Sequence, residues 1–250
     1  MKIDYPQGHH LQPLQRLWKE AFGDDDAFLE NFFCRVFSPD RCRCVTVDDD
    51  VIAAVYWLDC RVYDKPLAYI YALATAKAHR GKKVGTALME DTYALLKDLG
   101  YAGVLLVPED HLVKMYEGLG YHLCTAIREF PCEAAEESLV LQQISAEEYA
   151  ALRRNYLPDG SVIQEGENLQ FLQTMVNFYA GEDVLFCASV TDGKCFCPEL
   201  LGNADAAPAI LRTLHAASGT FRTPGTEKPF AMFRPIAQMP DPNYFGFAFD

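Results

Sequence analysis

A basic, glycine-containing loop joins an apolar strand to a helix in the first half of the chain. The strand candidate is 68–76, the loop reads His79-Arg80-Gly81-Lys82-Lys83-Val84-Gly85-Thr86, and a helix is expected over about 82–99, before Gly100. The first turn of a helix carries unpaired N–H groups and the positive end of the helix dipole. The loop therefore predicts an anion site, most often one for a phosphate.

Strands and helices alternate through this half, which predicts an α/β (α+β) fold. Helices are expected at 11–22 and 25–37, a hairpin at 42–47 and 51–63, a strand at 103–107, a short helix at 111–119 and a strand at 121–132. The continuous apolar run at 103–107 is typical of a parallel strand that is buried on both faces. The first half therefore predicts a mixed sheet flanked by helices.

The second half predicts a smaller α+β domain. Its pattern favours helices at 145–156, 168–179 and 206–217, a hairpin at 184–190 and 194–198, and strands at 229–235 and 244–250. The polar, acidic segment 131–137 is the best candidate for a linker. Both halves open with two helices and a hairpin, an order that fits a degenerate internal duplication.

Charge, hydrophobicity and cysteine spacing exclude several classes of function. The chain has 22 Lys and Arg against 35 Asp and Glu, a net charge of −13, so it lacks the basic footprint that nucleic-acid binding needs. The N-terminus has no apolar signal segment and no apolar run could span a bilayer, which predicts a cytoplasmic protein without a membrane partner. The nine cysteines form no CxxC pair, so we expect reduced thiols and no metal site.

Two motifs narrow the identity of the anion. Residues 80–85 follow the pattern Arg/Gln-x-x-Gly-x-Gly/Ala, with Lys83 in place of the first glycine, and Tyr116-Glu-Gly-Leu-Gly120-Tyr121 follows Tyr-x-x-x-Gly-Phe/Tyr. Neither the nucleotide P-loop pattern nor GxGxxG occurs. In this order, on a strand-loop-helix-strand-helix-strand framework, the two motifs resemble those of the GNAT-type N-acetyltransferases. The resemblance covers roughly residues 10–130.

This resemblance implies a fold, a donor and a reaction. Residues 1–132 would form a GNAT-type acetyl-CoA-binding domain, and 138–250 a smaller α+β domain, a degenerate repeat that completes the acceptor cleft. Acetyl-CoA would donate its acetyl group directly to a primary amine of a small molecule or peptide. The expected coenzyme-binding residues are Leu73, Ala74, Thr75, Arg80, Gly81, Lys82, Lys83, Val84, Gly85 and Thr86.

The resemblance also implies a general acid. Tyr116 falls at the position of the family's general acid, which protonates the departing thiolate. The alternative is that Tyr116 is a packed aromatic at helical spacing from Leu112 and Leu119. Lys83 still offers a backbone N–H, but its Cβ disfavours the positive φ that glycine allows, so the anion site is retained if Lys83 lies in the helical region.

Several points stay open at this stage. The base that deprotonates the amine could be a water chain, a carboxylate of Glu109, Asp110 or Glu129, or the chain terminus at Asp250; we favour the terminal segment as an edge strand. The alternative function is a non-catalytic acyl-CoA sensor or interaction module. The acceptor amine and the oligomeric state are not readable from the sequence.

Overall fold

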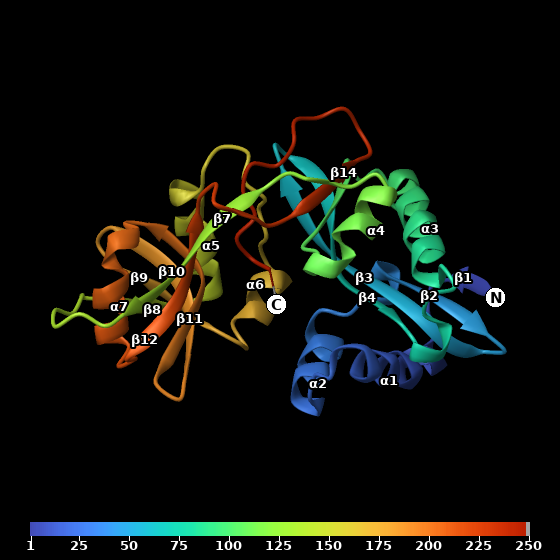
Figure 1. Cartoon of the computed structure of the whole chain (residues 1–250), viewed down its shortest axis with the longest axis horizontal. Coiled ribbons are helices and arrows are strands. Elements are labelled where there is room, and N and C mark those ends of the chain that lie inside the picture. The colour runs from blue at the N-terminus through green and yellow to red at the C-terminus, as the bar shows by residue number, and fades with distance from the viewer. Residues whose placement is uncertain (249–250) are drawn as a thin grey trace. The chain divides into compact units, whose positions relative to one another are not determined.

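The computed structural model describes residues 1–248 and divides the chain into two compact units (Figure 1). The first unit consists of 1–122 and 232–240, and the second of 123–231 and the chain from 241 onward. Each contains a seven-stranded mixed sheet, which confirms the predicted fold class. The units differ from the expected division into 1–132 and 138–250 because residues 232–235 join the first sheet and residues 126–133 join the second.

The first unit follows the predicted order of elements. Its helices are η1 (Gly8–His10), α1 (Leu11–Phe22), α2 (Asp26–Arg35), η2 (Pro39–Arg41), η3 (Lys77–His79), α3 (Val84–Asp98), η4 (Asp110–Leu112) and α4 (Val113–Gly118). Its strands are β1 (Lys2–Asp4), β2 (Cys42–Val47), β3 (Asp50–Val62), β4 (Lys65–Thr75), β5 (Gly103–Leu106), β6 (His122–Leu123) and β14 (Met232–Pro235). They lie in the order β1-β2-β3-β4-β5-β14-β6, with β4 and β5 parallel.

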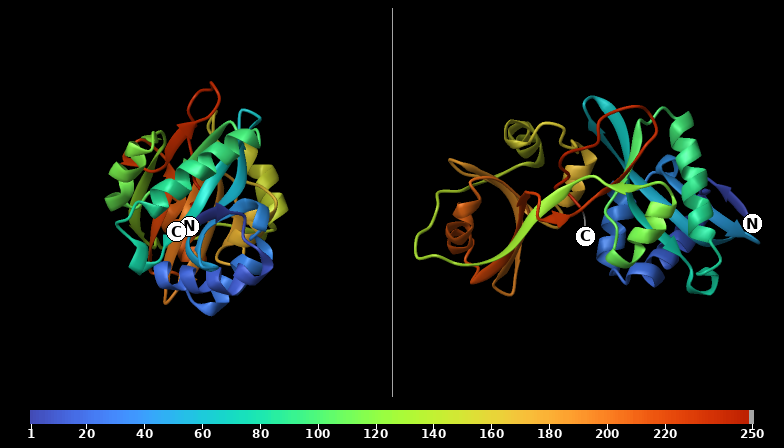
Figure 2. Two further views of the ribbon diagram at one scale, coloured as in Figure 1. Left: turned by 90° about the vertical axis from the view of Figure 1, so that its right-hand side faces the viewer. Right: turned by 45° about the horizontal axis from the view of Figure 1, so that its top comes forward.

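Helices cover both faces of this sheet, as Figures 1 and 2 show for α1 and α2 on one side and α3 and α4 on the other. Successive residues of β3 point to opposite faces. Val55 and Trp57 belong to the core beneath α3 and α4. Tyr56 points the other way and meets Trp18 of α1 and Phe32 of α2, at ring distances of 5.0 and 5.6 Å.

The parallel strands β4 and β5 pair over only part of their length. Their register runs from Leu67 opposite Gly103 to Ile70 opposite Leu106. The register of β4 against β3 shifts just beyond this point, which leaves Tyr71 as a β-bulge. Within residues 1–248, the stretch 72–75 then pairs with β3 alone. The carboxyl end of β4 therefore has a free edge at 72–75.

The second unit repeats this plan. Its strands are β7 (Ala126–Glu133), β8 (Gln142–Ile144), β9 (Asn177–Ala180), β10 (Val184–Thr191), β11 (Lys194–Gly202), β12 (Ser218–Pro224) and β13 (Lys228–Pro229). Its helices are α5 (Ala146–Tyr156), α6 (Glu167–Leu172), η5 (Ala204–Ala206) and α7 (Ala207–Thr213). The sheet order is β8-β9-β10-β11-β12-β7-β13, with β11 and β12 parallel.

The shared order of pairings supports the internal duplication. In each unit two helices follow the first strand, four strands pair antiparallel, one helix leads to a parallel fifth strand, and an antiparallel strand lies beyond it. That last strand is β14 in the first unit and β7 in the second. In each sheet, one continuous segment of the chain forms the first five strands. The sixth strand comes from outside that segment.

Several expected elements of the second unit are wrong. The helix predicted at 168–179 ends at Leu172, and 177–180 form β9, because pairing with β8 and β10 outweighs the local helical pattern. The helix predicted at 206–217 ends at Thr213, and His215 then takes a positive φ of 56°. The proposed linker 131–137 begins inside β7, which pairs with β12 up to Glu133.

The strand predicted at 229–235 is interrupted. Residues 244–248, the described part of the strand predicted at 244–250, do not form a strand. Residues 228–229 and 232–235 form separate strands, in different sheets. Tyr244 forms a single bridge to Ser161, and 245–248 have no regular structure. Phe249 and Asp250, and with them the terminal carboxylate, lie outside the described residues. Among the helices of residues 1–248, none combines the length and hydrophobicity that crossing a bilayer requires.

Candidate functional site

The basic loop turns through two left-handed residues before α3 begins. Arg80 is extended (φ −66°, ψ 156°), and Gly81 has φ +72°. Lys83, the residue before α3, has φ +59° and ψ +19°. Lys83 therefore does not lie in the helical region, and it adopts a positive φ of the kind that glycine allows. For a residue with a Cβ this conformation costs about 1–2 kcal/mol.

The N-terminus of α3 is open to a ligand. No side chain caps it, and its first turn contains no acidic residue. By contrast, Asp25 caps α2 and Ser145 caps α5 through side-chain hydrogen bonds. The N–H groups at 84–86 are therefore not bound by a capping side chain and can bind an anion.

A cavity of about 510 Å³ lies at this helix start. Nine of the ten predicted coenzyme residues line it: Leu73, Ala74, Thr75, Arg80, Gly81, Lys83, Val84, Gly85 and Thr86. Lys82 does not, because its Nζ turns back to the carbonyl oxygen of Ala78 at 2.9 Å. The cavity thus joins the helix N-terminus to the free end of β4.

Backbone and side chains approach closely within this cavity. A Cβ added to Gly85 would lie 3.2 Å from Oγ1 of Thr75, so glycine lets α3 start close to the end of β4. Arg80 donates from Nε to the carbonyl oxygen of Thr75 at 2.9 Å, which fixes its guanidinium beside the cavity. The basic loop before α3 and the end of β4 therefore form one continuous wall of the cavity.

Other elements supply lining residues that the motifs did not indicate. They are Ala21 and Phe22 from α1, His79 from η3, and Glu109, His111, Leu112 and Met115 from the segment after β5. Glu109 was one of the predicted candidates for the base, and His111 is the first residue of the helix predicted at 111–119. Their position directly after a buried strand was the one sequence signal that pointed to this cavity.

Tyr116 lies beside the cavity rather than in its lining. It is 6% exposed and packs edge-on against Tyr121, with ring centroids 5.7 Å apart. Burial, and to a smaller extent the charge of Glu109, raises the pKa of Tyr116 to about 12. The phenol therefore carries its proton at neutral pH, as a general acid must.

The carboxylates considered as bases occupy very different surroundings. Glu129 lies in the second unit and accepts from Lys228 and Arg222, and the hydrogen bond from Lys228 is the main reason why its pKa is lowered. A paired carboxylate of this kind is a poor base. Of Glu109, Asp110 and Glu129, only Glu109 lines the cavity.

One group among residues 1–248 brings three potential metal ligands together: His9, His10 and Asp49. Nε2 of each histidine lies within 3.3 Å of Oδ1 of Asp49. Nδ1 of His10, however, accepts the backbone N–H of Gln7 at 3.0 Å. In the neutral ring the proton is then on Nε2, which donates to Asp49 and has no lone pair for a metal. This arrangement is a hydrogen-bonded cluster in its present geometry.

Comparison with known proteins agrees with this geometry. A family model described as an acetyltransferase (GNAT) domain matches residues 2–124. The fold resembles GCN5-related N-acetyltransferases from Kribbella flavida (18% identity, TM-score 0.71) and Anabaena variabilis (14%, 0.74), each over 94% of this chain and 72% of the other. It also resembles a putative acetyltransferase from Pyrococcus horikoshii (14%, 0.63), over 96% and 92% of the two chains. A search of curated proteins finds no match.

Proposed function

Residues 2–124 belong to the acetyltransferase (GNAT) family, and from this premise we propose that the chain transfers an acetyl group from acetyl-CoA to a primary amine of a small molecule or peptide. Acyl transfer from acyl-CoA follows from the family. The observation that carries the finer proposal is the uncapped start of α3, which opens into the same cavity as the free edge of β4.

The residues present fit a coenzyme with a diphosphate and an extended arm. The N–H groups at 81–86, with the charges of Arg80 and Lys83, would hold the diphosphate. The edge of β4 at 72–75, beyond its pairing with β5, would hydrogen-bond the arm as a neighbouring strand does. Backbone groups at 73–75 would polarise the thioester carbonyl, and the rest of the rate would come from aligning the amine. The bound coenzyme would supply the activated acyl group.

Tyr116 would protonate the departing sulfur. With a phenol pKa of about 12 against about 8.5 for a free thiol, complete transfer from tyrosine to thiolate is uphill by about 5 kcal/mol. The proton should therefore move while the carbon–sulfur bond breaks, when the sulfur is most basic. Desolvation of the sulfur would raise the pKa of the thiol and so reduce the difference between the pKa values of the phenol and the thiol.

The test separates binding from turnover. Titration with acetyl-CoA should show saturable binding, and thiol release should follow with at least one amine of a panel of polyamines, amino sugars, amino acids and peptides. Absence of binding would overturn the proposal. Binding without turnover on any amine would favour the alternative, an acyl-CoA sensor.

A pair of variants tests the acid. Tyr116→Phe should lower kcat by about 10²–10⁴-fold while coenzyme affinity stays nearly constant. Tyr121→Phe is the matched control, because Tyr121 is also buried and touches Tyr116 but does not hold the acid position. If Tyr116→Phe weakened binding and turnover equally, the ring would be structural.

A further inference from the structure

The coenzyme cavity contains a carboxylate and an imidazole in contact, and neither has a role in the proposed reaction. Glu109 and His111 both line it, and Nδ1 of His111 lies 3.2 Å from Oε2 of Glu109. Both come from the segment after β5, whereas the cations of the cavity come from the loop before α3. The side chains are 71% and 69% exposed, so both are accessible from solvent.

A carboxylate in this position opposes the ligand that the cavity attracts. The uncapped helix start, Arg80 and Lys83 favour an anion, and Glu109 adds a negative charge to the same wall. Like charges in one site disfavour binding. His111 offsets this effect only when its ring is protonated, because the neutral ring carries no charge. The charge on His111 should therefore influence how strongly the cavity binds phosphate.

We propose that His111 is a phosphate-binding residue of the coenzyme site, positioned by Glu109, and that it acts in its protonated form. This inference rests on the function proposed above. Nδ1–H would donate to Glu109, which fixes the ring and leaves Nε2–H to donate to a phosphate oxygen of the coenzyme. Glu109 is then a positioning residue. Its carboxylate binds His111 and does not act as the base that accepts the proton of the amine.

The proposal predicts a proton linkage. Phosphate oxygens next to an imidazole favour its charged form, so coenzyme binding takes up a proton from solvent near neutral pH. The other charged or titratable groups of the cavity lining are Arg80, Lys83 and His79. Glu20 of α1 is nearby but accepts the backbone N–H of Lys77. His79 is the one other imidazole that could take up the proton, and it must be tested separately.

Calorimetric titration of the full chain with CoA, in two buffers of different ionisation enthalpy, measures this uptake directly. We expect uptake of up to about one proton per CoA near pH 7, and an affinity that falls several-fold between about pH 6 and about pH 8. A 3′-phosphate that binds as a dianion releases protons, the opposite sign. Dephospho-CoA, which lacks that group, therefore isolates the contribution of the protein.

Variants assign the proton to a residue. His111→Gln should lose most of the uptake and weaken CoA binding about 3–10-fold near pH 6, with little change near pH 8.5. His79→Gln, the matched control, should keep the uptake. Glu109→Gln should reduce the uptake without weakening binding near pH 8.5, because it removes the orienting partner and also the repulsion.

The outcomes distinguish this inference from the function on which it rests. If the wild-type chain does not bind CoA, the proposed function fails, and the inference with it. If the wild type binds CoA without taking up a proton, or His111→Gln changes neither uptake nor affinity, the inference alone is overturned. It is equally overturned if His111→Gln removes the acidic limb of kcat/KM with CoA affinity unchanged, because His111 would then act as the base.

Discussion

Arg153 and Glu199 form a two-point ion pair inside the second unit. Nε of Arg153 donates to Oε2 at 2.7 Å and Nη2 donates to Oε1 at 2.9 Å, with the side chains 2% and 0% exposed. The hydroxyls of Tyr149 and Tyr244 donate to the same carboxylate at 2.9 and 3.1 Å. Phe247 lies over the guanidinium, with its ring centroid 4.3 Å away. One buried carboxylate therefore ties the irregular tail 244–247 to α5 and β11.

Removing the charge of Glu199 should destabilise the second unit strongly. Glu199→Gln keeps the side-chain shape but leaves Arg153 buried without a counter-ion, which costs about 3–5 kcal/mol in the free energy of unfolding. Urea unfolding measures it. Glu165→Gln is the matched control, because Glu165 pairs with the neighbouring Arg154 at the surface and should lose less than about 1 kcal/mol. Equal losses in the two variants would contradict a buried pair that orders the tail.

Gly103 on β5 should tolerate no side chain, because β14 lies against it. A Cβ added there would lie 2.3 Å from Cε2 of Phe233, whose ring is fully buried. Gly103→Ala should cost about 1–3 kcal/mol and Phe233→Ala about 3–5 kcal/mol. The double variant should be more stable than the sum predicts, because removing the ring removes the clash.

Urea unfolding of the two single variants and the double variant measures this coupling. Gly118→Ala in α4 is the control, because no atom lies within 4 Å of its added Cβ. It should leave stability unchanged or raise it by up to about 1 kcal/mol. Strict additivity of Gly103→Ala and Phe233→Ala would show that β14 does not pack on β5 as described.

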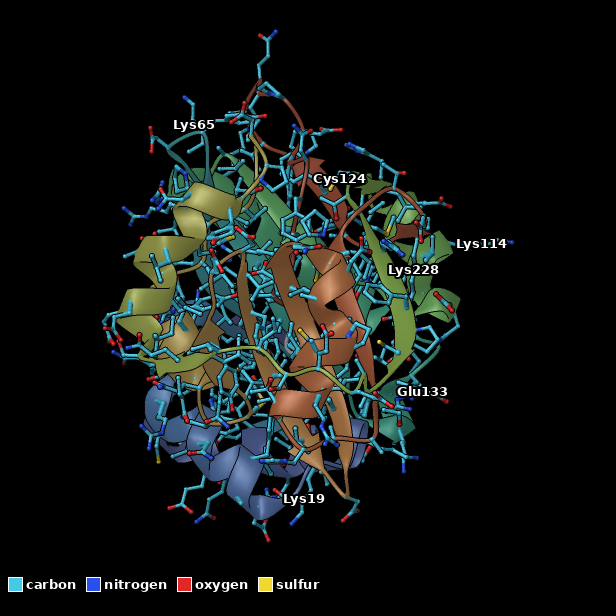
Figure 3. The ribbon with its side chains drawn as sticks, turned by 90° about the vertical axis from the view of Figure 1, so that its left-hand side faces the viewer. Lys19, Lys65, Lys114, Cys124, Glu133 and Lys228 are labelled. Atoms are coloured by element: carbon cyan, nitrogen blue, oxygen red, sulfur yellow. The ribbon has the colours of Figure 1, made fainter. Side chains whose placement is uncertain are left out.

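Lys83 has an unfavourable backbone conformation and a positive charge that we propose attracts the coenzyme phosphates. Two variants separate the effect of the conformation from that of the charge. Lys83→Gly should relieve about 1–2 kcal/mol of strain, offset by about 0.4–1 kcal/mol of added freedom in the unfolded chain. Lys83→Ala keeps the strain, so thermal unfolding should rank the glycine variant above it. Both should weaken CoA binding a few-fold through loss of the charge. Lys114→Ala should not, because Lys114 on α4 points into solvent (Figure 3).

The sequence predicted those parts of the fold whose signals are local. The anion loop, the helices at 11–22 and 84–98 and the strand at 103–106 each carry their period and end signals within a few residues. The segment 168–179 could not be resolved in this way, because its apolar residues fit a helix while distant strands select β9. The positive φ of Lys83 could not be predicted from the sequence, because the surrounding loop overrides a steric preference of only about 1–2 kcal/mol.

The site was predictable where a motif defines it and not where distant segments meet. Nine of the ten predicted coenzyme residues line the cavity, but Glu109 and His111 join them only because the segment after β5 lies beside the basic loop before α3. Nothing local in the sequence distinguishes Arg153 and Glu199 from surface residues, since these side chains are rarely buried. Their pairing, like that of β14 with β5, depends on segments far apart in the chain.

The thiols offer a direct check of burial. All nine cysteines are free thiols, and Cys34 is the exposed one among them. Burial raises the pKa of Cys44 and of Cys195 to about 11, so these thiols are also poor nucleophiles at neutral pH. A thiol reagent should modify Cys34 fastest in the native protein, the half-buried Cys124 and Cys132 more slowly, and the six buried thiols only on unfolding. Cys34→Ser should abolish the fast phase, and its persistence would mean that another thiol is accessible.

The pKa of Tyr116 gives a further test of its proposed role as the general acid. Burial raises this pKa to about 12, so an alkaline limb that Tyr116 causes in kcat/KM should lie above about pH 11. A limb near pH 9 that disappears in Tyr116→Phe would contradict this pKa.

The same shift makes stability depend on pH. In the folded state Tyr116 keeps its proton to a higher pH than in the unfolded chain, where its pKa is about 10. Its stabilising contribution should be complete below about pH 10 and decline by up to about 2.7 kcal/mol as pH rises towards about 12. Urea unfolding of the wild type and Tyr116→Phe near pH 9 and pH 11 isolates this contribution, because the other buried tyrosines are common to both proteins. The stability difference between the two proteins should shift in favour of the phenylalanine variant at the higher pH, since phenylalanine has no proton to lose.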